Sequence, residues 1–88
     1  MTEIPACAAI YNPDLEMIVA EKRHDRCYKG LINSGVSHIG FIQGFMTNQG
    51  RFVNRTEAMT LAKAANMHSC YSKDGVLRGA VLFSEDLY

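Results

Sequence analysis

The chain has 88 residues, of which 48% are hydrophobic and 20% charged, and this balance excludes an intrinsically disordered chain. Its nine lysines and arginines equal its nine aspartates and glutamates, so it lacks the basic excess of a general nucleic-acid binder. We therefore expect one domain over residues 1–88 that does not bind duplex nucleic acid. Because so short a chain buries a modest share of its surface, this apolar content favours a homo-oligomer, built from dimers.

The cysteines and the apolar runs indicate where the protein works. Cys7, Cys27 and Cys70 are odd in number and widely spaced, which argues against a disulfide framework and for a reducing compartment. No run approaches the ~18 apolar residues of a membrane span, and the N-terminus does not resemble a signal peptide. We expect a cytoplasmic protein with no membrane partner. The three histidines match no metal motif, and we expect neither a metal nor a cofactor.

The first half of the chain predicts a hairpin followed by a helix. Residues 6–11 and 15–20 are apolar runs on either side of Asn12-Pro13-Asp14, a strong turn signal. Residues 24–34 then carry apolar positions at helical spacing, and Gly35 stands where a glycine commonly ends a helix.

The second half is dominated by one well-marked helix. Residues 36–45 have a mixed pattern that is in part strand, residues 47–50 form a turn, and residues 51–53 form a short link. Asn54 is a good N-cap, with Glu57 at the capping-box position, and we expect the helix to end near Asn66-Met67. A loop and an apolar run with an acidic end follow. The fold class is α+β, a small antiparallel sheet packed against two α-helices.

The start of this second helix is a candidate anion site. Backbone N–H groups and the positive end of the helix dipole gather there. Arg51 and Arg55 flank the cap although first-turn positions favour acids, so they either serve a ligand or are simply solvated. Phe45 and Phe52 bracket the preceding turn, as core residues or as a stacking surface for a base.

Two other features allow competing interpretations. His24 and Cys27 are spaced as neighbours on one helix, but Cys27 also belongs to the apolar face, and we expect no catalysis. Residues 84–86 (Ser-Glu-Asp) form either a solvent-facing tail or a carboxylate cluster that orders an arginine or accepts ribose hydroxyls.

Three segments carry a resemblance to a known family. They are Arg23-His24 with Cys27, the stretch QGFMTNQGRFVNRTEA at residues 43–58, and LFSEDLY at residues 82–88. In order and spacing they resemble small phage proteins of the first-described Thoeris anti-defence family. Members of that family are molecular sponges that bind cyclic ADP-ribose isomers without cutting them, and some hold cyclic oligonucleotides at separate sites in a larger assembly.

The resemblance implies a function and a ligand. It implies a non-enzymatic phage counter-defence protein of the host cytoplasm that sequesters a cyclic nucleotide immune signal, a glycocyclic ADP-ribose isomer or a related cyclic nucleotide. Arginines pair with phosphates and aromatic faces accept a base. The candidate ligand-binding residues are Arg23, Phe45, Asn54, Arg55 and Arg78.

The sequence departs from the family pattern at two places. Arg26 stands where an acid is expected, which weakens the match of the first-helix contacts. Ala65-Asn66-Met67 replaces the usual Ala-Gly-Gln helix end, which indicates a divergent subfamily and leaves room for a different ligand. The alternative function is a phage inhibitor that binds a host protein directly, in the manner of anti-CRISPR proteins. An enzyme is the third class.

Overall fold

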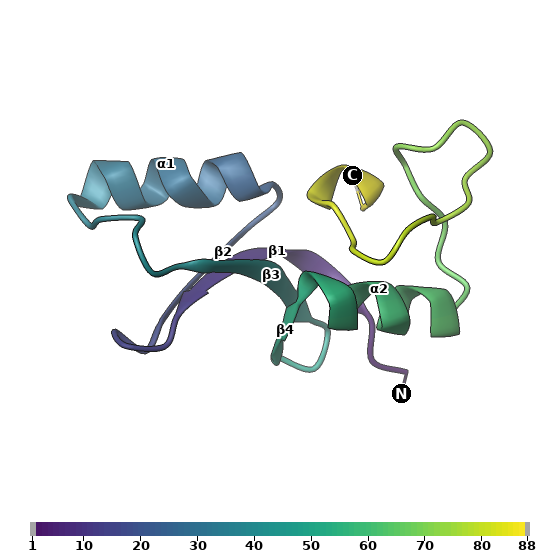
Figure 1. The fold of residues 1–88 in the computed structure, drawn as a ribbon, viewed down its shortest axis with the longest axis horizontal. Coiled ribbons are helices and arrows are strands. Elements are labelled where there is room, and N and C mark those ends of the chain that lie inside the picture. The colour runs from purple at the N-terminus through teal and green to yellow at the C-terminus, as the bar shows by residue number, and fades with distance from the viewer. Residues whose placement is uncertain (1, 88) are drawn as a thin grey trace.

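The predicted hairpin forms half of a four-stranded antiparallel sheet (Figure 1). The computed structural model describes residues 2–87. Strand β1 (Pro5–Asn12) pairs with β2 (Met17–Glu21). Between them the Asn12 side chain accepts hydrogen bonds from the N–H groups of Asp14 (2.9 Å) and Leu15 (3.2 Å), which is how an asparagine stabilises a turn.

A second hairpin completes the sheet and corrects one prediction. Strand β3 (Ile42–Thr47) lies between β1 and β4 (Phe52–Asn54), and the strand order is β2-β1-β3-β4. The predicted link at residues 51–53 is wrong, because Phe52 and Val53 pair with β3. A three-residue strand is too short for its alternation to be recognised in the sequence. At Gly44 in β3, a Cβ atom would lie only 2.5 Å from the Phe52 ring, so the glycine admits this ring.

Both helices form where the sequence predicts them. Helix α1 (His24–Ser34) ends at Gly35, whose φ of 74° is left-handed. Helix α2 (Arg55–Ala64) starts with the predicted capping box: Glu57 N–H donates to the Asn54 side chain (2.7 Å), and Asn54 N–H donates to the Glu57 carboxylate (3.1 Å). Helix α2 ends at Ala64, slightly earlier than predicted. The α+β fold class is confirmed.

The two helices cover one face of the sheet and create two cores. Ala8 and Ile10, two residues apart on β1, point to the same face. Ala8 belongs to the core beneath α2, and Ile10 to the smaller core beneath α1. The α2 core comprises Ala8, Phe45, Val53, Ala58, Met59, Ala62, Leu77 and Leu82. The smaller core consists of Ile10, Cys27 and Leu31, with partly buried neighbours.

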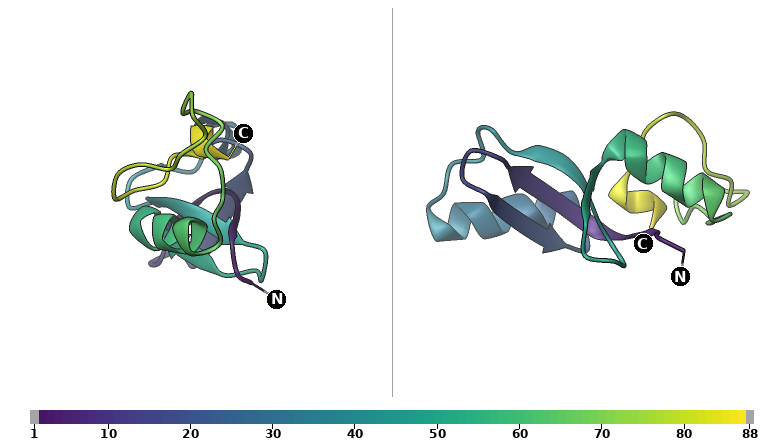
Figure 2. Two further views of the ribbon diagram at one scale, coloured as in Figure 1. Left: turned by 90° about the vertical axis from the view of Figure 1, so that its right-hand side faces the viewer. Right: turned by 90° about the horizontal axis from the view of Figure 1, so that it is seen from below.

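The C-terminal segment returns to lie beside both helices (Figures 1 and 2). Residues 68–83 contain no helix or strand, and a 3₁₀ turn, η1 (Ser84–Asp86), follows. The buried Asp86 carboxylate accepts a hydrogen bond from Ser69 Oγ (2.5 Å), and Leu82 N–H donates to the Arg55 carbonyl (3.0 Å). The first bond closes the segment on itself, and the second fixes it against α2. The last motif residue, Tyr88, lies outside the described residues.

No helix within residues 2–87 is both long and apolar enough to span a membrane.

Candidate functional site

The first residues of α1 and α2 converge on η1, and the start of α1 faces η1 in Figure 1. Arg23, the N-cap of α1, lies with its Nη1 atom 3.6 Å from a Glu85 carboxylate oxygen. Arg55, the first residue of α2, donates from Nε to the Leu82 carbonyl (3.1 Å). We call this region the junction site and define it by its five side chains: Arg23, His24, Arg55, Phe83 and Glu85.

Arg55 is positioned by an aromatic ring. Its guanidinium carbon lies 4.4 Å from the centroid of the Phe83 ring, a cation–π geometry. Among residues 2–87, hydrogen bonding of the Arg55 side chain is limited to its Nε atom. The Nη groups therefore remain able to donate to an anion, in the fork geometry that suits phosphate.

His24 anchors the start of α1 to strand β3. Its Nε2 atom lies 2.7 Å from the Gly44 carbonyl oxygen and, because a carbonyl only accepts, must carry the proton. The imidazole also meets the Phe45 ring edge-on, with centroids 5.2 Å apart. Burial lowers the pKa of His24, and the Arg55 charge adds to this, against the opposing Gly44 hydrogen bond and the carboxylates of Glu85 and Asp25. The geometry favours a neutral, fixed imidazole.

An aromatic pocket adjoins the junction site at Phe83. One cavity of about 210 Å³ is lined by Tyr71, Phe83 and Glu85. A second, of about 280 Å³, lies between Tyr71, Phe83 and Arg78. Tyr71 is 77% exposed and Phe83 49%, so both rings are accessible. Since small-molecule sites start at about 300 Å³, each cavity suits part of a ligand, such as one base.

Arg78, a predicted site residue, lines the second of these cavities and is already paired with Asp74. Its Nη1 atom donates to Asp74 Oδ1 (2.9 Å) and to Ser72 Oγ (3.1 Å). The guanidinium holds the pKa of the Asp74 carboxyl well below its usual range, with help from Ser72. A ligand of Arg78 would have to share it with Asp74.

The structure gives three other candidates local roles. Phe45 has no exposed surface, so the stacking role considered for it is corrected: its ring belongs to the core because Ala8 and Val53 flank it in the register of the sheet. The Asn54 side chain caps α2. Arg51 does not face a ligand site with Arg55 but donates from Nη2 (2.7 Å) and Nε (3.0 Å) to Glu3, whose pKa it lowers.

The sequence analysis missed Tyr71 and the role of Asp86. Ser69 Oγ, held by Asp86, accepts hydrogen bonds from the N–H groups of Tyr71 and Ser72 (3.1 Å each), and so the loop that presents Tyr71 is fixed. No local signal marks this bond, because 17 residues separate its partners. The acidic turn does place a carboxylate beside an arginine, because Glu85 forms an ion pair with Arg23.

Comparison with known proteins gives one match. A family model described as "Phage T4 y16D protein" matches residues 4–88. No curated protein and no solved structure matches the chain significantly.

Proposed function

The chain belongs to the phage T4 y16D protein family, and from that premise we propose that this phage protein is a non-enzymatic counter-defence protein. It acts in the host cytoplasm, where it binds and sequesters a cyclic nucleotide immune signal. The ligand is a glycocyclic ADP-ribose isomer, with cyclic oligonucleotides as a further class. One observation carries the proposal: the segments at 23–27, 43–58 and 82–87, which are far apart in the sequence, contribute neighbouring side chains to the junction site.

The chemistry of the junction site suits a diphosphate joined to a base. Arg23 and Arg55 supply two guanidinium groups, and planar guanidinium pairs well with phosphate. Helix α1 has no side-chain cap, so its first N–H groups can donate to the same anion. The exposed rings of Tyr71 and Phe83 can stack on a base, while Glu85 can accept ribose hydroxyls.

Two features favour binding over hydrolysis. Burial raises the pKa of the Cys27 thiol to about 11, so Cys27 stays protonated at neutral pH. A protonated thiol is a poor nucleophile, because the thiolate is the reactive form. His24 carries its Nε2 proton toward Gly44, so that nitrogen does not serve as a base for a ligand. We therefore propose that the captured nucleotide stays intact.

Self-association is part of the proposal. The sheet face opposite the helices carries Tyr11, which pairs in register with Ile18 and Ile42. Ile18 is 42% exposed and Ile42 48%, and an apolar face of this kind is commonly buried in an interface. A homo-oligomer built from dimers would cover it.

The test combines calorimetry and native mass spectrometry. The protein is titrated with cyclic ADP-ribose isomers and cyclic oligonucleotides, then heated, and the released ligand is identified by mass. We expect micromolar or tighter binding and an intact ligand. Arg55→Gln should weaken binding about tenfold or more, whereas Lys29→Gln, which also removes one positive charge but lies away from the junction site, should not. A hydrolysed ligand, or no binding across the panel, would refute the proposal.

A further inference from the structure

The two edges of the sheet differ in how they are protected. At one edge β4 has three residues and runs directly into α2. At the other, β2 has five residues, Met17–Glu21, and within residues 2–87 its only strand partner is β1. Proteins usually blunt an exposed edge with proline, lysine or extreme shortness. Strand β2 has no proline or lysine, and its only charge is Glu21 at its end. Its outward N–H and C=O groups form an open template.

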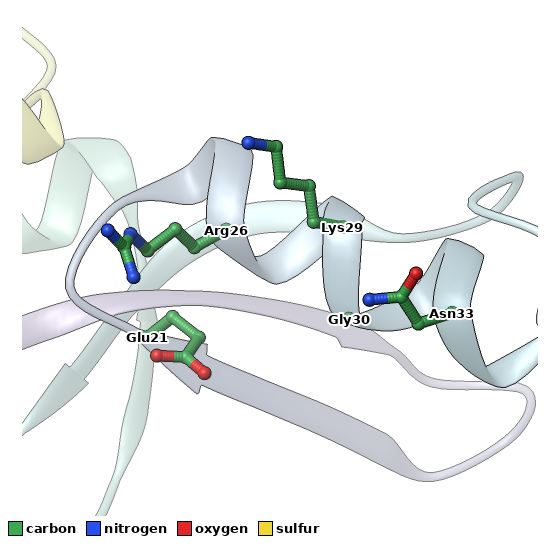
Figure 3. A pocket seen from close by; sticks show the side chains of 5 residues that line it. All are labelled: Glu21, Arg26, Lys29, Gly30 and Asn33. Atoms are coloured by element: carbon green, nitrogen blue, oxygen red, sulfur yellow. The ribbon is translucent and has the colours of Figure 1, made fainter.

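A polar groove lies at the end of this open edge, between Glu21, the last residue of β2, and α1 (Figure 3). It has a volume of about 350 Å³ and is lined by Glu21, Arg26, Lys29, Gly30 and Asn33. The helix residues are spaced at three or four positions and thus share one side of α1. Gly30 forms the middle of this side, and a Cβ atom placed there would meet nothing within 4 Å. The groove is therefore open at Gly30.

The net charge of the residues that line the groove is positive. Among the described residues, neither the Arg26 nor the Lys29 side chain takes part in an ion pair or a hydrogen bond. Figure 3 shows the Arg26 side chain extending on the side of α1 that faces Glu21. Two cationic residues and the single carboxylate of Glu21 line the groove, and the Lys29 side chain extends away from Glu21 in Figure 3. An occupant with carboxylates would complement this groove.

We propose that the β2 edge and this groove bind an extended, acidic segment of another protein by strand addition. The segment pairs with the backbone of β2, which gives affinity, and places carboxylates against Arg26 and Lys29, which gives specificity. A second copy of this chain fits less well, because its own β2 would bring another Arg26 and Lys29 to the interface. The proposal does not depend on nucleotide binding at the junction site.

The probe is a blocked peptide that alternates valine and glutamate, titrated into ¹⁵N-labelled full-length protein. We expect amide shifts to concentrate in β2 and on the groove side of α1. A valine–lysine peptide should bind at least about tenfold more weakly. Lys29→Glu should lower the affinity for the glutamate peptide by about tenfold, while the matched charge reversal Lys73→Glu and the junction variant Arg55→Gln leave it unchanged.

Two further arms separate strand addition from simple charge attraction. N-methylation of one alternate set of peptide amides should abolish binding, whereas methylation of the other set should not. Gly30→Leu should block the groove without loss of stability, since its side chain meets open space, and Ser34→Leu is the matched control outside the groove. Equal tolerance of both methylated peptides, displacement by inorganic phosphate, or shifts that reflect dimerisation in sedimentation would each overturn the proposal.

Discussion

Helices α1 and α2 begin in the same region of the molecule but are started by different means. Helix α2 has a complete capping box, in which Asn54 and Glu57 satisfy each other's backbone N–H groups. Helix α1 has Arg23 at its N-cap and no side-chain cap. Its start is held by distant partners instead: Gly44, Phe45 and Glu85. One start is fixed locally, and the other depends on tertiary contacts.

The difference explains where a ligand can act. A capped helix start has already satisfied part of its N–H groups, whereas the start of α1 retains donors and a positive dipole end. Three side chains of the junction site, Arg23, His24 and Glu85, take part in the contacts that hold the start of α1. A ligand bound there would accept hydrogen bonds from N–H groups at the start of α1 that no side chain caps. The comparison between the two helix starts can be tested by substitution.

Phe45→Ala is expected to have the largest effect, because it removes a fully buried ring that contacts His24 at the start of α1. Deletion of a buried phenylalanine side chain lowers the free energy of unfolding by about 3–5 kcal/mol. Chemical denaturation measures this loss, and amide exchange should increase in α2, whose core contains the ring, and at the start of α1, which the ring meets through His24. Phe52→Ala, at a half-buried ring, is the control and should have a smaller effect. A loss no greater than that of the control would contradict the assigned role of Phe45.

Asn54→Ala should have an intermediate effect, confined to α2. It removes the side-chain oxygen that accepts from Glu57 N–H, and loss of an N-cap lowers the free energy of unfolding by about 1 kcal/mol. Asn54→Ser keeps a capping oxygen and should recover most of the loss. Amide exchange should increase in the first turn of α2 and stay unchanged in α1. Equal exchange changes in both helices would show that the two starts are coupled.

The features of the fold that could be predicted from sequence are those fixed by neighbouring residues, and the features that could not are those fixed by tertiary contacts. The turn at Asn12, the end of α1 at Gly35 and the cap at Asn54 depend on partners within a few residues. The short strand β4 and the burial of Phe45 depend on pairing across the sheet. No local pattern reports such pairing.

The candidate site was predicted in part for the same reason. Arg23 and Arg55 were identified from motifs and lie together with Phe83 and Glu85. Their joint placement depends on contacts such as that between Arg55 Nε and the Leu82 carbonyl, 27 residues apart. Tyr71 is placed in the same region by its hydrogen bond to Ser69, which in turn bonds Asp86, 17 residues away.

A change of pH should produce the smallest effect and tests the α1 start directly. Burial lowers the pKa of His24 below its ordinary value of 6.5, so between the two pKa values the unfolded chain binds more protons than the folded one. Stability is then fully present above about pH 6.5 and falls as the pH drops through this window. Thermal unfolding at about pH 7.5 and about pH 5.5 measures the fall, and His24→Gln, whose amide can still donate to Gly44, should reduce it.

The control for this prediction is His38→Gln, because His38 lies exposed in the loop between α1 and β3. That variant should keep the pH dependence of the parent. The Glu3 carboxyl, whose pKa Arg51 lowers from 4.5, contributes only at more acid pH and does not obscure the window. If His24→Gln loses as much stability on acidification as the parent, another group titrates in this window. The neutral His24 imidazole would then not account for the pH dependence.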